Sequence, residues 1–447
     1  MSAGRAVVFR LLLVAFSIAV FLATGEIALR LVYRDQGKRT LGGPGQQPFE
    51  HVTTDGQNQR GRFDAGNKSP DKPRILVLGD SITWGQGVRE WEDTWPERLA
   101  RALEQAGTPH EMAVLSLPGR NIPEHLAEFE YWGRRLRPDV FIYQWYVNDI
   151  EIDARRPQNA RWWQQQSWHD PLRRASYLYY FLESRLATYL PAPERSYVDY
   201  ILEDYAPGTL EWAEFERYFH RLALRAIEVA PTRLLVLYPQ VPFRDTSPLK
   251  PIHDRLTTLA SRAQRLDIPP AAWIRHAGTP IESAEAPWRQ AVTITPGHVG
   301  PVIETREYYL PAGGSDVALT VALDSVVDGA WGILDLIDAT SNQVIATAPL
   351  IRAKESAARW QQVTVHPALP AYPTLVRLRL SSTGLTGFSV ANLGISVNYA
   401  FKVVDLTDDL NTFNTHASVF DAHPNEQAHK VMAEKILEAL RQAEARH

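Results

Sequence analysis

The longest uncharged apolar run lies near the start of the chain. It covers residues 11–24, and Arg5 and Arg10 precede it. The run has the length of a signal-peptide core and is shorter than the ~20 residues that span a bilayer, but an apolar helical pattern resumes over residues 27–32. We therefore expect residues 1–33 to form an uncleaved single-pass membrane anchor. A cleaved signal peptide and a buried core helix are the alternatives.

Strand and helix patterns alternate between residues 73 and 273. Short, continuously apolar runs at 75–78 and 234–237 are typical of strands buried on both faces, whereas residues 210–229 and 249–266 follow a helical period. Further strand-like runs cover 112–117 and 140–145, and further helical ones cover 95–103 and 124–136. This alternation predicts an α/β domain with a parallel sheet between two layers of helices. Residues 34–72 lack a sustained apolar period and are predicted to form a linker or lead-in.

After about residue 270 the pattern changes to a period of two. Val317, Leu319 and Val321 alternate with small or polar residues, which is typical of strands in an antiparallel sheet. The α/β pattern returns with an apolar run at 401–406 and an amphipathic helix at 425–443. We therefore predict an α/β domain made of two parts, 73–273 and 399–447, with an all-β sandwich inserted at 274–398.

Composition narrows the function classes. The 447 residues include 47 Lys+Arg and 51 Asp+Glu, so the net charge of −4 argues against a nucleic-acid partner. The absence of cysteine from the sequence excludes disulfides, thiolate zinc sites and cysteine nucleophiles. No metal-ligand pattern stands out, and we expect neither a metal nor an organic cofactor.

Candidate catalytic residues follow the predicted strands. Ser81, in the sequence Gly-Asp-Ser-Ile, directly follows the first strand-like run, although this short motif also occurs in ordinary turns. Gly119 and Asn148 follow the second and third runs, and His423 follows the last one. Because the carboxyl ends of parallel strands meet at one edge of a sheet, these groups are expected to converge there. A serine, a base and several N–H donors around one point are what acyl transfer requires.

This ordered set resembles the SGNH, or GDSL-type, serine hydrolase superfamily. The resemblance implies a flavodoxin-like three-layer α/β/α fold in which Ser81 is the nucleophile and His423 the general base. It further implies that Asp421 orients the histidine, and that the Ser81 N–H, the Gly119 N–H and Asn148 form the oxyanion hole. Asp80 and Asp149 are expected to support these loops by accepting hydrogen bonds from backbone N–H groups.

The sequence departs from the family pattern at two positions. The family spacing is Asp-x-x-His, whereas Asp421 lies two residues before His423, so Asp408 or Asp409 could orient the histidine instead. Tyr146 stands where the family's third block commonly has glycine, and this substitution is expected to narrow the pocket.

Together, the resemblance and the N-terminal segment imply an extracytoplasmic, membrane-anchored carboxylic ester hydrolase. It would lie in the periplasm or on the cell surface, or be secreted if the segment is cleaved. The expected substrate is an acylated, most simply acetylated, carbohydrate of the cell envelope or another small ester. Two alternatives stay open: an O-acyltransferase with the same triad, and a non-catalytic glycan-binding or assembly protein. Aromatic residues of the insert form either a sugar-stacking platform or core; they are Tyr308, Tyr309, Trp331 and Trp360. The sequence does not indicate an oligomeric state.

Overall fold

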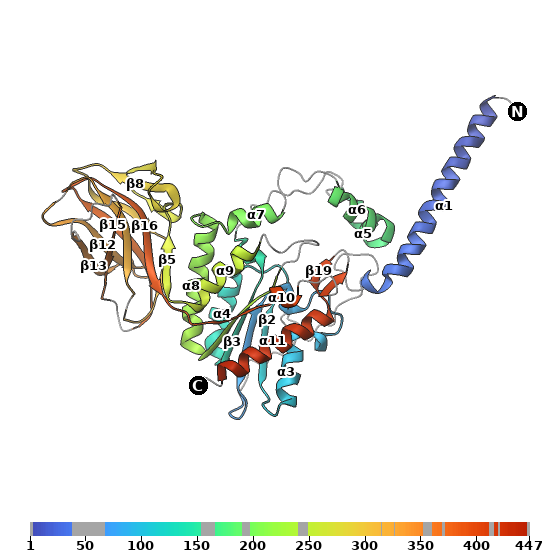
Figure 1. Ribbon diagram of the computed structural model, residues 1–447, viewed down its shortest axis with the longest axis horizontal. Helices are drawn as coiled ribbons and strands as arrows, with labels where there is room; N and C mark the ends of the chain where they lie inside the picture. Colours follow the sequence, from blue (N-terminus) through green and yellow to red (C-terminus); the bar gives the residue numbers. More distant parts are fainter. Residues whose placement is uncertain are drawn as a thin grey trace.

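The protein is elongated, with a β-sandwich, an α/β domain and a long N-terminal helix, α1 (Ala3–Gly37), arranged in a row (Figure 1). The computed structural model describes residues 3–37, 68–152, 166–189, 197–239, 249–313, 315–325, 327–351, 360–368, 372–410, 415–418 and 421–444. Most of the predicted linker, residues 38–67, therefore lies outside the described residues.

The α/β domain is built on a five-stranded sheet with the order β17-β4-β3-β1-β2. All four pairings in this sheet are parallel, as the alternation of strand and helix patterns predicts. Its strands are β1 (Arg74–Gly79), β2 (Glu111–Ser116), β3 (Val140–Trp145), β4 (Thr232–Leu237) and β17 (Lys402–Asp405). The carboxyl ends of all five strands consequently lie at one edge of the sheet.

Helices cover both faces of this sheet. In β1, Ile75 and Val77 face one hydrophobic cluster, and Leu76 and Leu78 face another, because successive strand residues point to opposite faces. The first cluster includes α3 (Trp95–Gln105) and α11 (Glu426–Glu444), and the second includes α4 (Ile122–Leu136), α8 (Leu210–Val229) and α9 (Lys250–Ser261). The remaining α-helices that follow α1 are α2 (Ser81–Trp84), α5 (His169–Ala175), α6 (Tyr177–Tyr189), α7 (Tyr197–Asp204) and α10 (Thr407–Leu410).

The insert consists of two antiparallel sheets, as the period-two pattern predicts. One has the order β13-β12-β15-β9-β6 with β10 paired to β15, and the other has the order β14-β11-β16-β8-β7 with β5 paired to β16. The strands are β5 (Gln264–Ile268), β6 (Trp273–Arg275), β7 (Thr279–Glu282), β8 (Gln290–Ile294), β9 (Val299–Thr305), β10 (Tyr308–Leu310), β11 (Val317–Leu323), β12 (Ala330–Asp338), β13 (Val344–Ile351), β14 (Gln361–Val365), β15 (Thr374–Thr383) and β16 (Phe388–Val397).

The structure corrects one sequence expectation about this region and decides one alternative that the sequence left open. The helix expected over residues 249–266 ends at Ser261, because Arg262 is extended and Leu266 and Ile268 then alternate into the sandwich core as part of β5. The aromatic residues proposed as a sugar platform are mostly core: Trp331 is fully buried, and Tyr308 and Tyr309 are 3% exposed. These three rings are therefore inaccessible to a sugar.

A buried histidine joins the sandwich to the α/β domain. His220 of α8 lies 2.7 Å (Nδ1) from the Tyr399 hydroxyl, and its Nε2 contacts the Tyr309 carbonyl oxygen. Burial lowers the pKa of His220 to about 4, so the ring is neutral at pH 7. A neutral ring matches these partners, since one nitrogen donates to the carbonyl and the other accepts from the hydroxyl.

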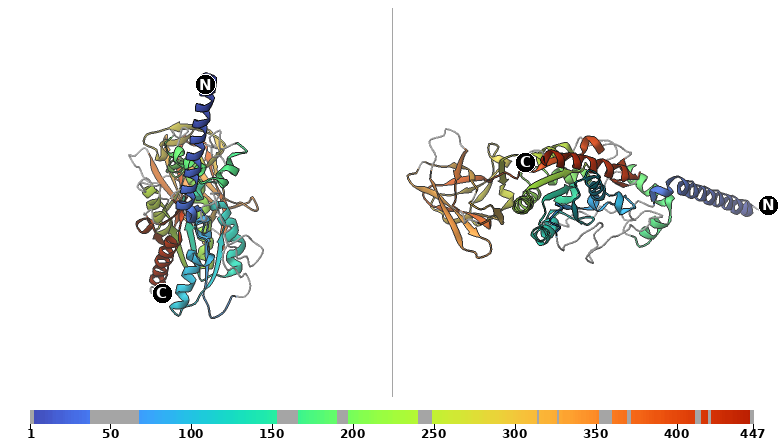
Figure 2. Two further views of the ribbon diagram at one scale, coloured as in Figure 1. Left: turned by 90° about the vertical axis from the view of Figure 1, so that its right-hand side faces the viewer. Right: turned by 90° about the horizontal axis from the view of Figure 1, so that it is seen from below.

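The N-terminal helix stands apart from the rest of the fold (Figure 2). Its segment Val8–Arg34 is 27 residues long and contains an 18-residue window with a mean hydropathy of 2.2, and no residue of that window is buried. Within the described residues, it is the one helix long and apolar enough to cross a membrane.

Candidate active site

Ser81 and His423 meet at the carboxyl edge of the parallel sheet. Ser81 is the first residue of α2, immediately after β1, and is 5% exposed. His423 lies in β19 (Asp421–Pro424), which pairs with β18 (His416–Ser418) in a small separate sheet. The distance from His423 Nε2 to Ser81 Oγ is 3.1 Å, although the residues are 342 positions apart. This geometry fits a serine hydroxyl that donates to the imidazole of a general base.

Asp80 is a fully buried carboxylate directly beside the serine. Its Oδ1 accepts from the Ile82 N–H at 3.0 Å and so caps α2, and its Oδ2 lies 3.3 Å from Ser81 Oγ. Burial and the nearby charge of Asp149 raise the pKa of Asp80 to about 6, against smaller opposing effects of the Ile82 N–H and two histidines. The carboxylate thus holds the Ser81 turn at a cost in stability.

The replacement Asp80→Asn should stabilise the fold at neutral pH. The folded-state pKa, about 6, lies above the ordinary value of 3.8, so ionisation costs about 3 kcal/mol at pH 7 and above. This cost shrinks as the pH falls through 6 towards 4. Asparagine keeps the acceptor for the Ile82 N–H without the charge. We expect a higher Tm for the variant at pH 8 and no advantage at pH 4, measured by thermal unfolding.

Asp139 provides a control of opposite sign. Hydrogen bonds from Lys68 and the Arg74 N–H outweigh its burial and lower its pKa. Asp139→Asn should therefore destabilise the protein at pH 8. An Asp80→Asn variant that is less stable than the unmodified protein at pH 8 would contradict the assigned cost.

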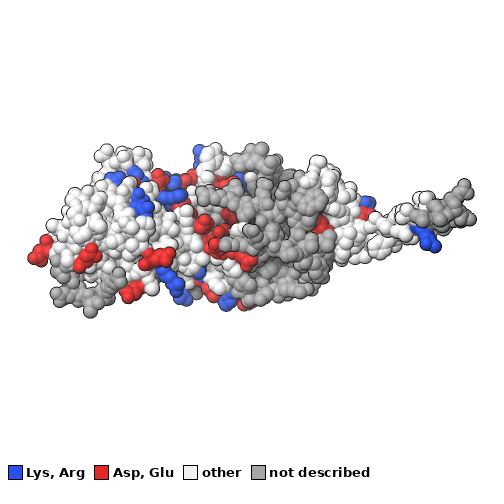
Figure 3. Space-filling view, turned by 90° about the horizontal axis from the view of Figure 1, so that it is seen from above, with Lys and Arg blue, Asp and Glu red and all other residues white. Residues whose placement is uncertain are grey.

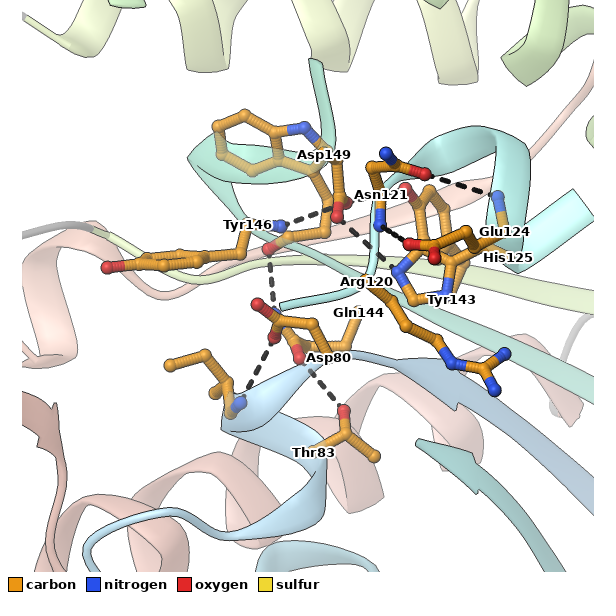
Figure 4. A network of polar contacts seen from close by, with 12 residues as sticks. Asp80, Thr83, Arg120, Asn121, Glu124, His125, Tyr143, Gln144, Tyr146 and Asp149 are labelled. Atoms are coloured by element: carbon orange, nitrogen blue, oxygen red, sulfur yellow. Dashed lines mark hydrogen bonds and ion pairs between the residues drawn. The ribbon is translucent and has the colours of Figure 1, made fainter. Parts of the chain in front are cut away.

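Asp149 supports the turn that carries Asn148. This turn is η2 (Val147–Ile150), which follows β3. The Asp149 carboxylate is fully buried and accepts from the Tyr143 hydroxyl at 2.6 Å and the Tyr146 N–H at 3.2 Å, and it lies 3.4 Å from Nε2 of buried His125 (Figure 4). Within the described residues, the Asn148 side-chain oxygen is buried and makes no hydrogen bond. The turn is thus held by its neighbours, and this oxygen of Asn148 is not used to hold it.

Gly119 follows β2 with a left-handed backbone, φ +78°, and a side chain there would meet no atom within 4 Å. The reason for glycine at this position is therefore the conformation of the loop and not crowding. The loop is fixed at its far end by Asn121, which caps α4: its side chain accepts from the Glu124 N–H, and the Glu124 carboxylate accepts from the Asn121 N–H (Figure 4). Arg120 forms an ion pair with Glu128 of the same helix.

Gly87 is a site residue that the sequence did not identify as such. It has φ +97°, and a Cβ atom there would lie 2.7 Å from both Ala417 Cβ and the Pro424 carbonyl oxygen, and 3.5 Å from His423 Cβ. The turn after the serine helix is therefore in close contact with the hairpin that carries the histidine. Only the glycine-rich composition of this turn was visible in the sequence.

The replacement Gly87→Ala should lower the activity strongly and the stability only slightly. The added methyl group pushes β19 away from α2, and a displacement of about 1 Å at a catalytic base can cost roughly 100-fold in kcat. The left-handed backbone adds about 1 kcal/mol of destabilisation. Ester hydrolysis and chemical unfolding measure the two effects.

Gly107→Ala is the matched control for that variant. Gly107 has φ +77°, and nothing lies within 4 Å of a Cβ atom built there. The Gly107→Ala variant should therefore lose the stability that a left-handed alanine costs and keep full activity. Equal activities of the two variants would mean that contact between the two turns does not position His423.

The residue that orients His423 stays a prediction. The Asp421 side chain lies outside what the structure describes, although its backbone pairs with Ser418. Of the two alternatives, Asp409 forms a 2.8 Å ion pair with Lys435 of α11, and Asp408 is exposed.

Comparisons with known proteins return partial structural likenesses. No family model matches the chain, and no curated protein matches its sequence. Similar solved structures include TesA, at 15% identity over 41% of this chain and 73% of TesA with a TM-score of 0.26. They also include the acetyl xylan esterase AlAXEase, at 15% identity over 42% of this chain and 71% of that chain with a TM-score of 0.25. A third is the C-terminal CBM6 of LamC from Zobellia galactanivorans, at 17% identity over 30% of this chain and all of that chain (100%) with a TM-score of 0.21. Sequence identities and TM-scores this low assign no activity to the chain.

Proposed function

We propose that this protein is an SGNH-type serine esterase with Ser81 as nucleophile and His423 as general base. The observation that carries the proposal is the 3.1 Å contact between Ser81 Oγ and His423 Nε2. The strand order supports it, because β2-β1-β3-β4-β17 is the order of a flavodoxin-like sheet, in which ligands bind at the carboxyl ends of the strands. Ser81, Gly119 and Asn148 follow three adjacent strands at that edge.

In the proposed reaction, Ser81 Oγ attacks the ester carbonyl carbon while its proton passes to His423 Nε2. The resulting oxyanion accepts hydrogen bonds from the Ser81 N–H, the Gly119 N–H and the Asn148 side-chain amide. The imidazolium then protonates the departing alkoxide, and an acyl-enzyme remains. Water, deprotonated by His423, releases the acid and restores the serine. Asp421 orients the imidazole in this scheme.

We further propose that α1 is retained as a membrane anchor, with the α/β domain on the extracytoplasmic side. The length and apolar surface of α1 support a membrane span. Arg5 and Arg10 precede the apolar run and favour this orientation, whereas Arg30 and Arg34 follow it and weaken the bias. The proposed substrate is a small acyl ester, acetyl in the simplest case, on a carbohydrate of the cell envelope. The inserted sandwich, predicted at 274–398 and built from strands β5 to β16, is proposed as an accessory module of this esterase.

Product analysis with the full-length protein tests this function. An esterase releases acetate from a chromogenic acetate ester at a rate that does not depend on added glycan. An O-acyltransferase would instead move the acetyl group to an added polysaccharide and release little acetate. A glycan-binding protein without catalysis would neither release acetate nor transfer the acetyl group. It would keep its glycan affinity after Ser81→Ala.

A further inference from the structure

The end of α1 is fixed to the hairpin formed by α5 and α6. The Glu26 carboxylate accepts hydrogen bonds from the N–H groups of Tyr177 and Leu178, at 3.2 and 2.8 Å, and from the Ser176 hydroxyl at 2.8 Å. Glu26 therefore caps the first turn of α6 although it lies 150 residues earlier in the chain than Ser176.

Further contacts extend along the same face of α1. Arg30 donates to the Ala175 carbonyl oxygen at 2.9 Å, where α5 ends, and forms an ion pair with Glu26 at 2.6 Å. One turn further on, the rings of Tyr33 and Phe181 stack with centroids 6.3 Å apart. Figures 1 and 2 show α5 and α6 beside the end of α1 that faces the α/β domain. The hairpin and the last turns of α1 form one unit.

This contact lies at the level where a bilayer would end. The 27-residue segment Val8–Arg34 is about 40 Å long, whereas the hydrocarbon core of a bilayer is ~30 Å thick. A core that begins at Val8 ends after about 20 residues, close to Glu26. The Glu26 cap and the hairpin bound to it therefore lie in the headgroup region.

The hairpin exposes large apolar side chains at this level. Trp168 is 46% exposed, Leu172 is 40% exposed and Leu182 is 44% exposed. Two pairs of side chains in the same hairpin contact each other: His169 Nε2 lies 2.8 Å from Glu183 Oε1, and the Arg173 guanidinium lies 5.0 Å from the centre of the Tyr180 ring. Asp170 and Arg174 are exposed beside them. Exposed tryptophan and leucine beside a membrane helix are typical of an element that lies in the bilayer interface.

We propose that the α5–α6 hairpin inserts Trp168, Leu172 and Leu182 into the outer interface of the bilayer that α1 spans. This inference rests on the proposed membrane anchor and adds a second, peripheral membrane contact to it. Because α1 also lies against β18, and β18 pairs with the strand that carries His423, the active site is held close to the membrane surface. In this proposal, lipid covers the exposed apolar side chains of the hairpin.

Single cysteines carrying an NBD fluorophore test the proposal, because the natural sequence contains no cysteine. Leu172→Cys and Leu182→Cys place the label on the hairpin at exposed positions, so folding is preserved. Phe16→Cys, 67% exposed in α1, is the positive control, and Val344→Cys, 52% exposed in the sandwich, is the negative control. Each full-length variant is reconstituted in phosphatidylcholine–phosphatidylglycerol vesicles with or without lipids that carry a doxyl quencher near the headgroup.

We expect the labels at positions 172 and 182 to show blue-shifted emission and to lose most of their fluorescence to the shallow quencher. The label at position 344 should keep its fluorescence. Quenching at position 16 by a deep doxyl quencher without quenching at 172 and 182 would overturn the hairpin inference and leave the anchor standing. An unquenched label at position 16 would overturn both the proposed membrane anchor and the hairpin inference. A blue shift at 172 and 182 without doxyl quenching would indicate a protein occupant, such as a second copy, and would overturn the lipid assignment.

Discussion

Ser81→Ala is expected to lower kcat/KM for a chromogenic acetate ester by about a million-fold, which is the scale of losing a serine nucleophile. In the proposed reaction the Ser81 hydroxyl oxygen forms the acyl-enzyme, and it lies 3.1 Å from His423 Nε2. The loss should fall on kcat, because the oxyanion donors and the substrate contacts remain. Initial rates on purified full-length protein measure it, and circular dichroism confirms that the variant folds.

Ser116→Ala is the matched control for the nucleophile. Ser116 is a buried serine at the end of β2, at the same edge of the sheet, and its hydroxyl makes no hydrogen bond within the described residues. Its removal should leave both activity and stability nearly unchanged. Retained activity of Ser81→Ala in a preparation free of other esterases would contradict the assignment of the nucleophile.

His423→Ala should reduce kcat/KM nearly as much, because Ser81 then has no base to take its proton. What activity remains should rise with pH, as hydroxide takes over the role of the imidazole. The double variant with Ser81→Ala should be no worse than either single variant, since the two side chains act as a unit. A pH–rate profile of each variant measures these effects.

His110→Asn is the control for the histidine. His110 is partly exposed and lies just before β2, at the opposite edge of the sheet from Ser81. It should retain full activity and the pH profile of the unmodified protein. A His423→Ala variant that keeps more than about a tenth of the activity would show that another group is the base, since a positioned base contributes at least about 100-fold.

The arrangement of strands and helices was largely predictable because it depends on local periodicity. Continuous apolar runs such as 75–78 correctly indicated parallel strands buried on both faces, and alternation around Val317 correctly indicated antiparallel sheets. The N-terminal apolar helix was equally visible in the sequence. The β5 strand was missed because Leu266 and Ile268 also fit the end of a helical pattern, and only their pairing with β16 distinguishes the two.

The site was predictable to the extent that its residues follow strands of one parallel sheet. Ser81 and His423 were paired on that argument and on family resemblance, and the structure places them in contact. Contacts between distant turns have no local signature. The approach of Gly87 to the histidine hairpin and the capping of α6 by Glu26 each join segments that no periodicity relates. The Asp80 pKa likewise depends on burial and on Asp149, which the fold alone brings near.

Composition gives the net charge of the protein but not how the charges are distributed over its surface. Acidic and basic side chains are interspersed on the face shown in Figure 3, so the net charge of −4 reflects a mixed surface and not one acidic patch on that face. The described residues on this face form no extended basic area of the kind that a nucleic-acid partner would need.

Fluorophosphonate labelling followed by peptide mapping tests the central claim most directly. The probe reacts with a serine only where a base activates it and an oxyanion site stabilises the adduct. The account predicts one modified peptide, labelled at Ser81, and loss of labelling in Ser81→Ala and His423→Ala with labelling retained in Ser116→Ala. An active preparation whose Ser81 peptide stays unmodified, or whose label maps to another serine, would contradict it.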